Sequence, residues 1–465
     1  MAHVPSSFRC ASKIMMLKKF LLFVLLAGLT ACDASTTPSP SVLTTPEVTA
    51  PAPAATAPTP TTTVVFWTVL PDQGVTAQAL GNMIEAFQRE NPGITIKVAT
   101  QPTYTELFRK VVASLAAGTL PDLVTGLDSD IAQYVRLRAL TPLDNYVQDA
   151  STGLSAAELA DIPPALAETM RIPDEGSTIY SLPFARGVMA LYYDWSAMKA
   201  IGITNTPKTW DEFKLHAGTL SKNPVRGFAY RPEVDVFEAM LLSRGGSLYS
   251  SDLSRATFNS PPGVDSLTFL TNGARENWIY RAEGNSDMTD FAAGRTIFNI
   301  AASTAIANYV AAVHDVTKKG GKVFEWGVTT LPQADLSKPE PALLVGSNIA
   351  ILKSTPEKQE AAWLFMRWLM RDKIAATWTQ TSGVLPARLA ARQWLTDYFV
   401  KVPQQQQAMD DLLPVAHAVP NIRPAPEVHD LIDGALNLYE GSKTSAQTAL
   451  DAAAAKATVL LNEKK

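Results

Sequence analysis

The sequence predicts an α/β protein whose folded part has two lobes. Residues 64–125 alternate between strand-like and helix-like segments, at the spacing of a parallel sheet with right-handed crossovers. Residues 63–465 exceed the length that one hydrophobic core usually serves, so two lobes are expected. The apolar content of 46% is that of a globular protein, and no later apolar run approaches the length of a membrane span.

The N-terminal segment has the features of an export signal. Lys18 and Lys19 precede an apolar run, Phe20–Leu29, that is too short to span a bilayer. It leads into Leu29-Thr30-Ala31-Cys32, which resembles a bacterial lipobox, the motif whose cysteine is lipidated and becomes the mature N-terminus. We therefore expect residues 1–31 to be a lipoprotein signal peptide and Cys32 to anchor the protein on the outer face of the cell membrane. A chance cysteine after a signal peptide is the alternative.

Residues 32–62 consist mostly of Ser, Thr, Pro and Ala. Such a segment cannot bury enough apolar surface to offset the entropy of ordering it, so we expect it to be disordered and extended. In a polyproline conformation it could hold the folded body up to roughly 90 Å from the lipid. Its position directly after Cys32 favours a tether over a low-complexity insert without a role.

The charge balance argues against a nucleic-acid partner. The chain has 40 basic and 44 acidic residues, and residues 1–31 hold four of the basic ones, which leaves 36 against 44, or −8, after cleavage. Nucleic acid requires a basic surface. Cys10 lies before the cleavage point, so Cys32 would have no disulfide partner. The histidines are scattered without the spacing of a zinc site, and neither a metal nor a cofactor is expected.

The first lobe opens with three strands and two helices. We expect strands at Val64–Val69, Ile94–Ala99 and Asp122–Thr125, with helices over residues 80–87 and 104–115 between them. Ligands of parallel sheets bind at the carboxyl ends of the strands. The candidate ligand-binding residues at those ends, in loops, are Asp72, Tyr104 and Asp128.

The later elements are spaced more widely. Two extended stretches, Ile179–Phe184 and Val188–Tyr193, are joined by residues 185–187. Leu343–Leu352 predicts a strand that is interrupted at residues 346–348. The remaining elements are a helix with a capping box at Thr209 and Glu212, a strand at Thr296–Ala301 and a helix that contains Ala361–Leu369.

No catalytic signature is apparent in the sequence. The chain lacks a GxSxG nucleophile elbow, a Walker loop and a GxGxxG turn after a strand, and no pair of carboxylates has the spacing of an acid and a base. Sugar binding instead needs planar hydrogen-bonding side chains and aromatic rings that stack on the apolar face of a sugar. The residues that could supply these are Trp67, Tyr104, Asp128, Tyr193, Trp326 and Trp378, although Trp67 is better explained by core packing.

Several segments occur in an order that is recognisable. The first are the Phe66-Trp67 strand, Glu90-Asn91-Pro92-Gly93-Ile94 and Leu115–Leu123. They are followed by Tyr180-Ser181-Leu182-Pro183, Leu191–Asp194, Pro207–Trp210, Glu360–Ala362 and Gly383–Pro386. Colinear over residues 63–465 and behind a lipobox, they resemble extracellular solute-binding proteins of the sugar-type ABC-importer family.

The C-terminal segments Val419–Arg423 and Glu440–Thr444 are similar to the glycerol-3-phosphate-binding branch of that family. In that branch an aromatic residue, an acid, a serine and an arginine contact the ligand, and the matching positions here are Tyr104, Asp128, Ser303 and Arg423. Gly346 and Ser347 match a glycine-containing crossing strand seen across the family. Arg186 stands where the branch has a small polar residue, Asp128 replaces a glutamate, and residues 230–235 lack the paired tryptophan. We keep Arg186 as a candidate anion clamp, and the alternative for Arg423 is a surface or hinge cation.

The resemblance implies a two-lobed, type II periplasmic-binding-protein-like fold with discontinuous lobes and a hinge. Lobe 1 would hold residues 63–183 and 300–342, and lobe 2 residues 184–299 and 343–465. The protein would be a monomer that binds a sugar or a glycerol-phosphate derivative between the lobes and delivers it to an ABC permease. Two other functions stay open, an exported enzyme acting on glycans and a ligand sensor that docks on a signalling receptor.

Overall fold

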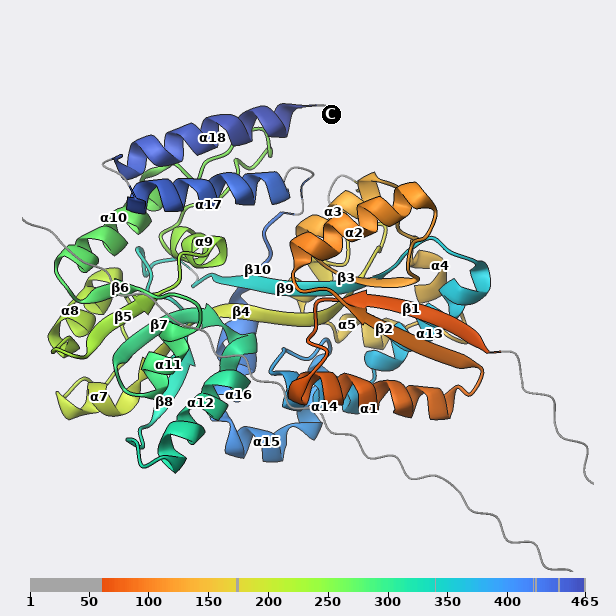
Figure 1. Cartoon of the computed structure of the whole chain (residues 1–465), viewed down its shortest axis with the longest axis horizontal. Coiled ribbons are helices and arrows are strands. Elements are labelled where there is room, and N and C mark those ends of the chain that lie inside the picture. Colours follow the sequence, from red (N-terminus) through yellow and green to blue (C-terminus); the bar gives the residue numbers. More distant parts are fainter. Residues whose placement is uncertain are drawn as a thin grey trace, which may run out of the picture. The chain divides into compact units, whose positions relative to one another are not determined.

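The computed structural model describes residues 61–172, 175–338, 340–420, 422, 425–441 and 444–463, which belong to one compact unit, Thr59–Lys465 (Figure 1). The expected signal peptide, Cys32 and nearly all of the expected tether lie outside the described residues, as does Arg423. Strand β1 (Thr62–Thr68) begins at the last residue of that tether. Among the described residues, no helix has both the length and the apolar character needed to cross a membrane.

The first half of the sheet is parallel, as predicted. Its strands and crossover helices are β1, α1 (Gly74–Glu90), β2 (Ile94–Thr100), α2 (Tyr104–Ala117) and β3 (Leu123–Leu127). Strand β1 lies between β2 and β3 and pairs with both in parallel. The predicted third strand ended at Thr125, but β3 runs on to Leu127, so Asp128 is the first residue of helix α3 (Asp128–Arg136) and not a loop residue.

Helices cover both faces of this half of the sheet. Successive side chains of β1 point to opposite faces, and on each face they pack against helices. Phe66 points to one face, where its ring lies 6.4 Å from that of Phe365 in α13 (Pro356–Leu369). Trp67 points to the other face and packs with residues of α2 and α3. Helix α13 thus packs on β1, although its residues fall in the range expected for lobe 2. An amphipathic helix does not reveal from its sequence which sheet it covers.

Two long strands belong to both halves of the sheet. Strand β4 (Leu182–Asp194) pairs with β9 (Ala342–Ile351) through residues 182–188 and with β7 (Thr296–Ala302) through residues 189–193. The prediction that residues 185–187 form a connection is wrong, because β4 is continuous and its register shifts only between Pro183 and Ala185. The predicted interruption of β9 is also wrong. Gly346 keeps its place opposite Arg186 with a positive φ of 99°.

The second half of the sheet is built around aromatic residues. Its further strands are β5 (Arg226–Tyr230), β6 (Ile279–Arg281) and β8 (Trp326–Thr329), and its main helices are α8 (Trp210–Leu220), α9 (Val234–Ser243) and α10 (Pro261–Arg275). The predicted capping box at Thr209 and Glu212 is confirmed at the start of α8. The Phe213 ring in α8 lies 5.3 Å from that of Phe228 and 4.9 Å from that of Phe298, which fixes this helix on the sheet.

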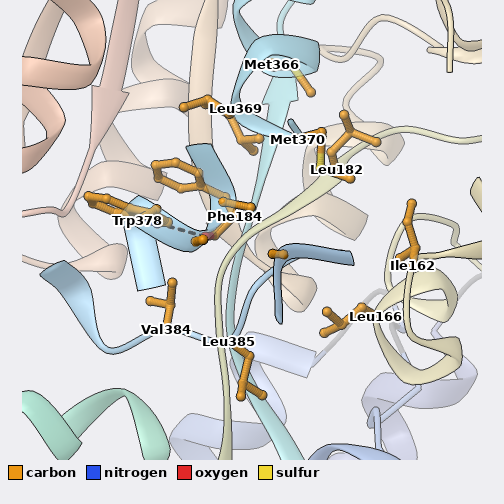
Figure 2. Close-up of a cluster of buried hydrophobic side chains, with 14 of the residues drawn as sticks. Ile162, Leu166, Leu182, Phe184, Met366, Leu369, Met370, Trp378, Val384 and Leu385 are labelled. Carbon is orange, nitrogen blue, oxygen red and sulfur yellow. Dashed lines mark hydrogen bonds between the residues drawn. The ribbon is translucent and has the colours of Figure 1, made fainter. Parts of the chain in front are cut away.

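A hydrophobic cluster beside β4 contains Trp378 of α14 (Asp372–Ser382) (Figure 2). Its ring stacks on that of Phe184 at 5.4 Å, and its Nε1 donates a hydrogen bond to the Phe184 carbonyl at 3.1 Å. Only 5% of Trp378 is exposed, so it is a core residue and not a platform for a sugar.

The chain ends in α17 (Ala425–Gly441) and α18 (Ala446–Asn462), which lie side by side in Figure 1 and pack on α9 and α10. The remaining α-helices and one strand include several short elements and one helix of 13 residues. They are α4 (Asp144–Val147), α5 (Ala156–Ala160), α6 (Pro164–Glu168), α7 (Trp195–Ala200), α11 (Ser286–Ala292), α12 (Ile306–Lys318), α15 (Thr396–Lys401), α16 (Pro403–Gln407) and β10 (Ala416–His417).

Candidate functional site

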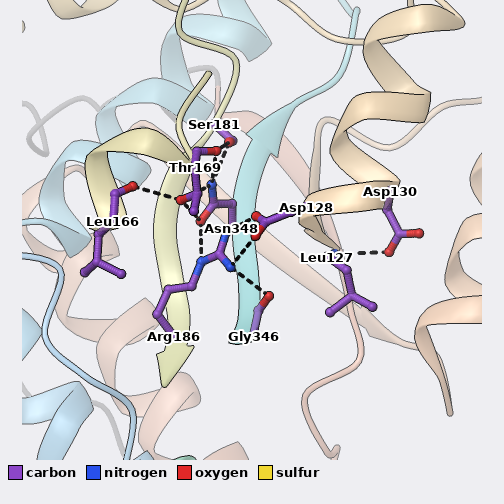
Figure 3. Close-up of polar contacts among 9 residues, drawn as sticks. All are labelled: Leu127, Asp128, Asp130, Leu166, Thr169, Ser181, Arg186, Gly346 and Asn348. Atoms are coloured by element: carbon purple, nitrogen blue, oxygen red, sulfur yellow. Dashed lines mark hydrogen bonds and ion pairs between the residues drawn. The ribbon is translucent and has the colours of Figure 1, made fainter. Parts of the chain in front are cut away.

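Arg186 lies in β4, opposite Gly346 of the antiparallel neighbour β9 (Figure 3). Its side chain is buried, and only 1% of the residue is exposed. Its Nη1 donates to Oδ2 of Asp128 at 2.9 Å, and its Nη2 donates to the other carboxylate oxygen. Its Nη1 also donates to the carbonyl of Gly346 at 3.0 Å, and its Nε donates to Oδ1 of Asn348 at 2.8 Å. A guanidinium has five N–H groups, so these bonds occupy most of them.

The amide of Asn348 extends this network on its far side. Its Nδ2 donates to the carbonyl of Thr169 and to the hydroxyl of Ser181, both at 2.8 Å. Asn348 and Ser181 are fully buried. The network therefore joins β4, β9, α3 and the segment after α6, and it holds Asp128 at the start of α3 in a single orientation. The side chain of Asp128 itself is 19% exposed, so it can still be reached by a ligand.

Glycine is required at position 346 by the close approach of β9 to β4. A Cβ atom there would lie 2.1 Å from the carbonyl oxygen of Ala185, and the positive φ is one that other residues rarely adopt. The next residue, Ser347, is fully buried, and its hydroxyl has no hydrogen bond of normal geometry. Burial raises the pKa of the nearby Tyr104 to about 12, and the closeness of the Ser347 hydroxyl partly opposes this.

A buried acid, Asp130, lies two residues after Asp128 on α3. Asp130 is 6% exposed and accepts a hydrogen bond from the backbone N–H of Leu127 at 3.1 Å. Burial raises the pKa of this carboxyl to about 7, and the charge of Asp128 adds to the effect.

Asp128 and Gly346 line a hollow of about 580 Å³ between α3, β9, α9 and α17. The opposite wall carries Asp235 and Glu238 of α9, and His429 of α17. A second hollow of about 590 Å³ adjoins it, since both are lined by Glu238, Val419 and Pro420.

The walls of the first hollow are acidic. Burial raises the pKa of Glu238 well above its ordinary value, and the neighbouring charge of Asp235 raises it further. Desolvation also raises the pKa of Asp235, an effect that Arg231 opposes. Burial lowers the pKa of His429, which favours its neutral form. Among the described residues, no group of three His, Cys, Asp or Glu side chains is arranged to hold a metal ion.

The structure brings five of the eight predicted site residues together, leaves two apart and does not describe the last. The five are Tyr104, Asp128, Arg186, Gly346 and Ser347. Ser303 is buried elsewhere along β4, where its hydroxyl accepts the N–H of Val188 at 3.1 Å. Asp72 is exposed in the loop between β1 and α1, and Arg423 lies outside the described residues.

Sequence reasoning missed Asn348 and the acids of α9. Glu238 stands between the buried residues Phe237 and Ala239 in a helix that is otherwise largely apolar. A charged residue inside an apolar helical run is the signal that could have identified it. Asn348 carried no comparable signal, because its partners lie far away in the sequence.

This geometry, a hollow lined by β9 and three helices with a held carboxylate on one wall, suits the binding of a small ligand. The chain belongs to the bacterial extracellular solute-binding protein family, whose model matches residues 82–407. The resemblance seen in the sequence is thereby confirmed. The proteins that the chain resembles are binding proteins.

One relative is the sn-glycerol-3-phosphate-binding periplasmic protein UgpB of Salmonella paratyphi A, 23% identical over 421 residues, which cover 86% of this chain and 92% of the relative. Among solved structures, UgpB of Mycobacterium tuberculosis in complex with glycerophosphocholine has a TM-score of 0.74 at 20% identity, covering 86% of this chain and 99% of the other. The ABC substrate-binding protein Lmo0181 of Listeria monocytogenes, in complex with cycloalternan, has a TM-score of 0.72 at 18% identity, covering 87% and 100%. These likenesses confirm the two-lobed fold.

Proposed function

We propose that the protein is the substrate-binding component of an ABC importer and binds a sugar or a glycerol-phosphate derivative between α3 and α9. The observation that carries this is Asp128, which is partly exposed at the hollow and is held by Arg186, itself hydrogen-bonded to Asn348. A fixed carboxylate is a planar acceptor for two neighbouring hydroxyl groups, which sugars and glycerol both provide. The family membership and the ligands of the compared proteins support the same class.

The proposal assigns different roles to the two charged residues of the network. Asp128 binds ligand, with Gly346 contributing backbone at the same wall. Arg186 acts as a positioning residue, because it is buried and already bonded to Asp128, Gly346 and Asn348. Arg186 and Arg423 were the two candidates for binding an anionic group of the ligand. For Arg423 that role remains a prediction. Tyr104 and Ser347 lie beside Asp128. Asp72 is exposed in a loop and Ser303 is fully buried, so neither is assigned a ligand contact.

A ligand screen tests this proposal. The protein would be titrated calorimetrically with mono-, di- and trisaccharides, glycerol 3-phosphate and glycerophosphodiesters. We expect binding of at least one of these, and Asp128→Asn should lose affinity by about 10-fold or more, equivalent to roughly 1.4 kcal/mol. Binding that is unchanged in Asp128→Asn would exclude this hollow as the site.

We further propose that Cys32 is lipidated and that residues 33–62 tether the body to the membrane, where the loaded form meets an ABC permease. The support is the lipobox-like sequence and the composition of the segment after it. Labelling of cells with an alkyne palmitate analogue should mark the protein and should not mark a Cys32→Ser variant. Equal labelling of both would refute the anchor.

A further inference from the structure

One oxygen of the buried Glu238 carboxyl has no hydrogen-bond partner among the described residues. The residue is 5% exposed, and its Oε1 makes no hydrogen bond. The residue lines both adjoining hollows. Burial of an unpaired carboxyl is costly, and such a group is retained only where something satisfies it.

Among the described residues, no basic side chain offsets the charge of Glu238. Asp235, one turn earlier on α9, lines the same hollow and adds negative charge. Arg231 is the basic group nearest to Asp235, but it contacts Glu233 at 3.1 Å and Asp287 at 3.4 Å. The other titratable side chains that face this region are Asp128, Tyr249, His417 and His429.

Asp128 on the opposite wall is already neutralised by Arg186. The first hollow therefore presents an ion pair on one side and, on the other, two carboxyls that form no ion pair with any described residue. A phosphate placed against α9 would be repelled, whereas a cationic group would relieve the burial of Glu238 and the repulsion between the two acids.

We propose that Asp235 and Glu238 form a subsite for a cationic nitrogen of the ligand. This inference rests on the proposed function and narrows it. The nitrogen could belong to an amino sugar or to the ammonium headgroup of a glycerophosphodiester, since both combine hydroxyl groups for Asp128 with a positive charge for α9. An ammonium N–H donates to both carboxylates, and a quaternary ammonium binds by charge alone.

Two matched pairs of ligands distinguish these sources. The first pair is the glucosamine trisaccharide against its N-acetylated form, which has no charge. The second pair is glycerophosphocholine against glycerol 3-phosphate. Titration calorimetry on the protein should give at least a 10-fold preference for the cationic member of one pair, and the pair that shows it identifies the source.

The variants Glu238→Gln and Asp235→Asn should each reduce that preference by about 10-fold. Glu233→Gln is the matched control, because it removes the same charge at the start of α9 from a residue that does not line the hollow. It should leave the preference unchanged. Glu238→Gln should not lower the melting temperature, since the carboxyl it replaces has no hydrogen bond at Oε1.

The possible results separate this inference from the proposed function. If neutral sugars bind and the cationic members bind no better than their partners, the subsite is refuted and the proposed function stands. A preference that survives in Glu238→Gln and Asp235→Asn also refutes the subsite. If no sugar or phosphodiester binds, both proposals fail.

Discussion

Arg186 and Asp128, which are 58 residues apart in the sequence, form a bidentate ion pair in which Nη1 of the arginine lies 2.9 Å from Oδ2 of the aspartate. The arginine is buried, while the aspartate is the partly exposed end of the pair. This asymmetry gives one member a structural role and the other a binding role. The first predictions follow from it.

Replacement of Arg186 by methionine should lower the free energy of unfolding by roughly 3–5 kcal/mol, because it leaves the Asp128 and Asn348 side chains without their shared partner. Urea denaturation measures this. Arg371→Met is the control, since Arg371 pairs with Glu90 at a surface where both side chains are about half exposed. It should cost at most about 1 kcal/mol. Equal losses in the two variants would contradict a structural role for the buried pair.

Asp128→Ala should weaken ligand binding and also lower stability. We expect an affinity loss of about 1.5–3 kcal/mol from the missing hydrogen bonds. The stability loss arises because the buried guanidinium of Arg186 would lose its counter-charge. Asp128→Asn keeps the shape and one acceptor, so its melting temperature should fall less. A fully stable Asp128→Ala variant would show that Arg186 finds another partner or water.

Gly346→Ala should destabilise the protein by several kcal/mol, since its Cβ would meet the carbonyl of Ala185 at 2.1 Å in addition to the strain of a positive φ. Gly284→Ala is a matched control, with a φ of +55° and nothing within 4 Å of the added Cβ. It should cost only the backbone strain, on the order of 1–2 kcal/mol. Chemical denaturation of both variants gives the difference, and equal values would show that β9 can move away from β4.

The raised pKa of Asp130, about 7, makes stability depend on pH. The folded protein holds this proton more tightly than the unfolded chain, whose aspartates titrate near 3.9. The stabilisation is therefore complete below about pH 4 and is lost as the pH rises through 7. Asp130→Asn should remove this part of the pH dependence, so its stability relative to the parent should improve between pH 5 and 8. An unchanged difference across that range would mean that Asp130 is ionised in the folded state.

The sequence revealed the first lobe well, because β1, β2, β3 and the helices between them are encoded by local periodicity. It failed where a residue's neighbours are remote. Arg186 was assigned to a connection and proposed as an anion clamp, yet it lies in a strand, and its partner Asn348 is 162 residues away.

The candidate site was only half visible for the same reason. Asp128 and Gly346 follow from the end of a strand and from the family resemblance. Glu238 is a charged residue within a largely apolar helix, but the hollow that it lines is closed by α17, which lies nearly 190 residues further along the chain.

We expect a ligand to bind at Asp128 in the hollow between α3 and α9. The most direct test is the melting temperature of the parent and of Asp128→Asn in the presence of the sugar and phosphodiester panel. A ligand at about 100 times its Kd should add roughly 2.7 kcal/mol to the parent, visible as a rise of several degrees, and much less to the variant. A ligand that raises both melting temperatures equally would show that binding takes place elsewhere.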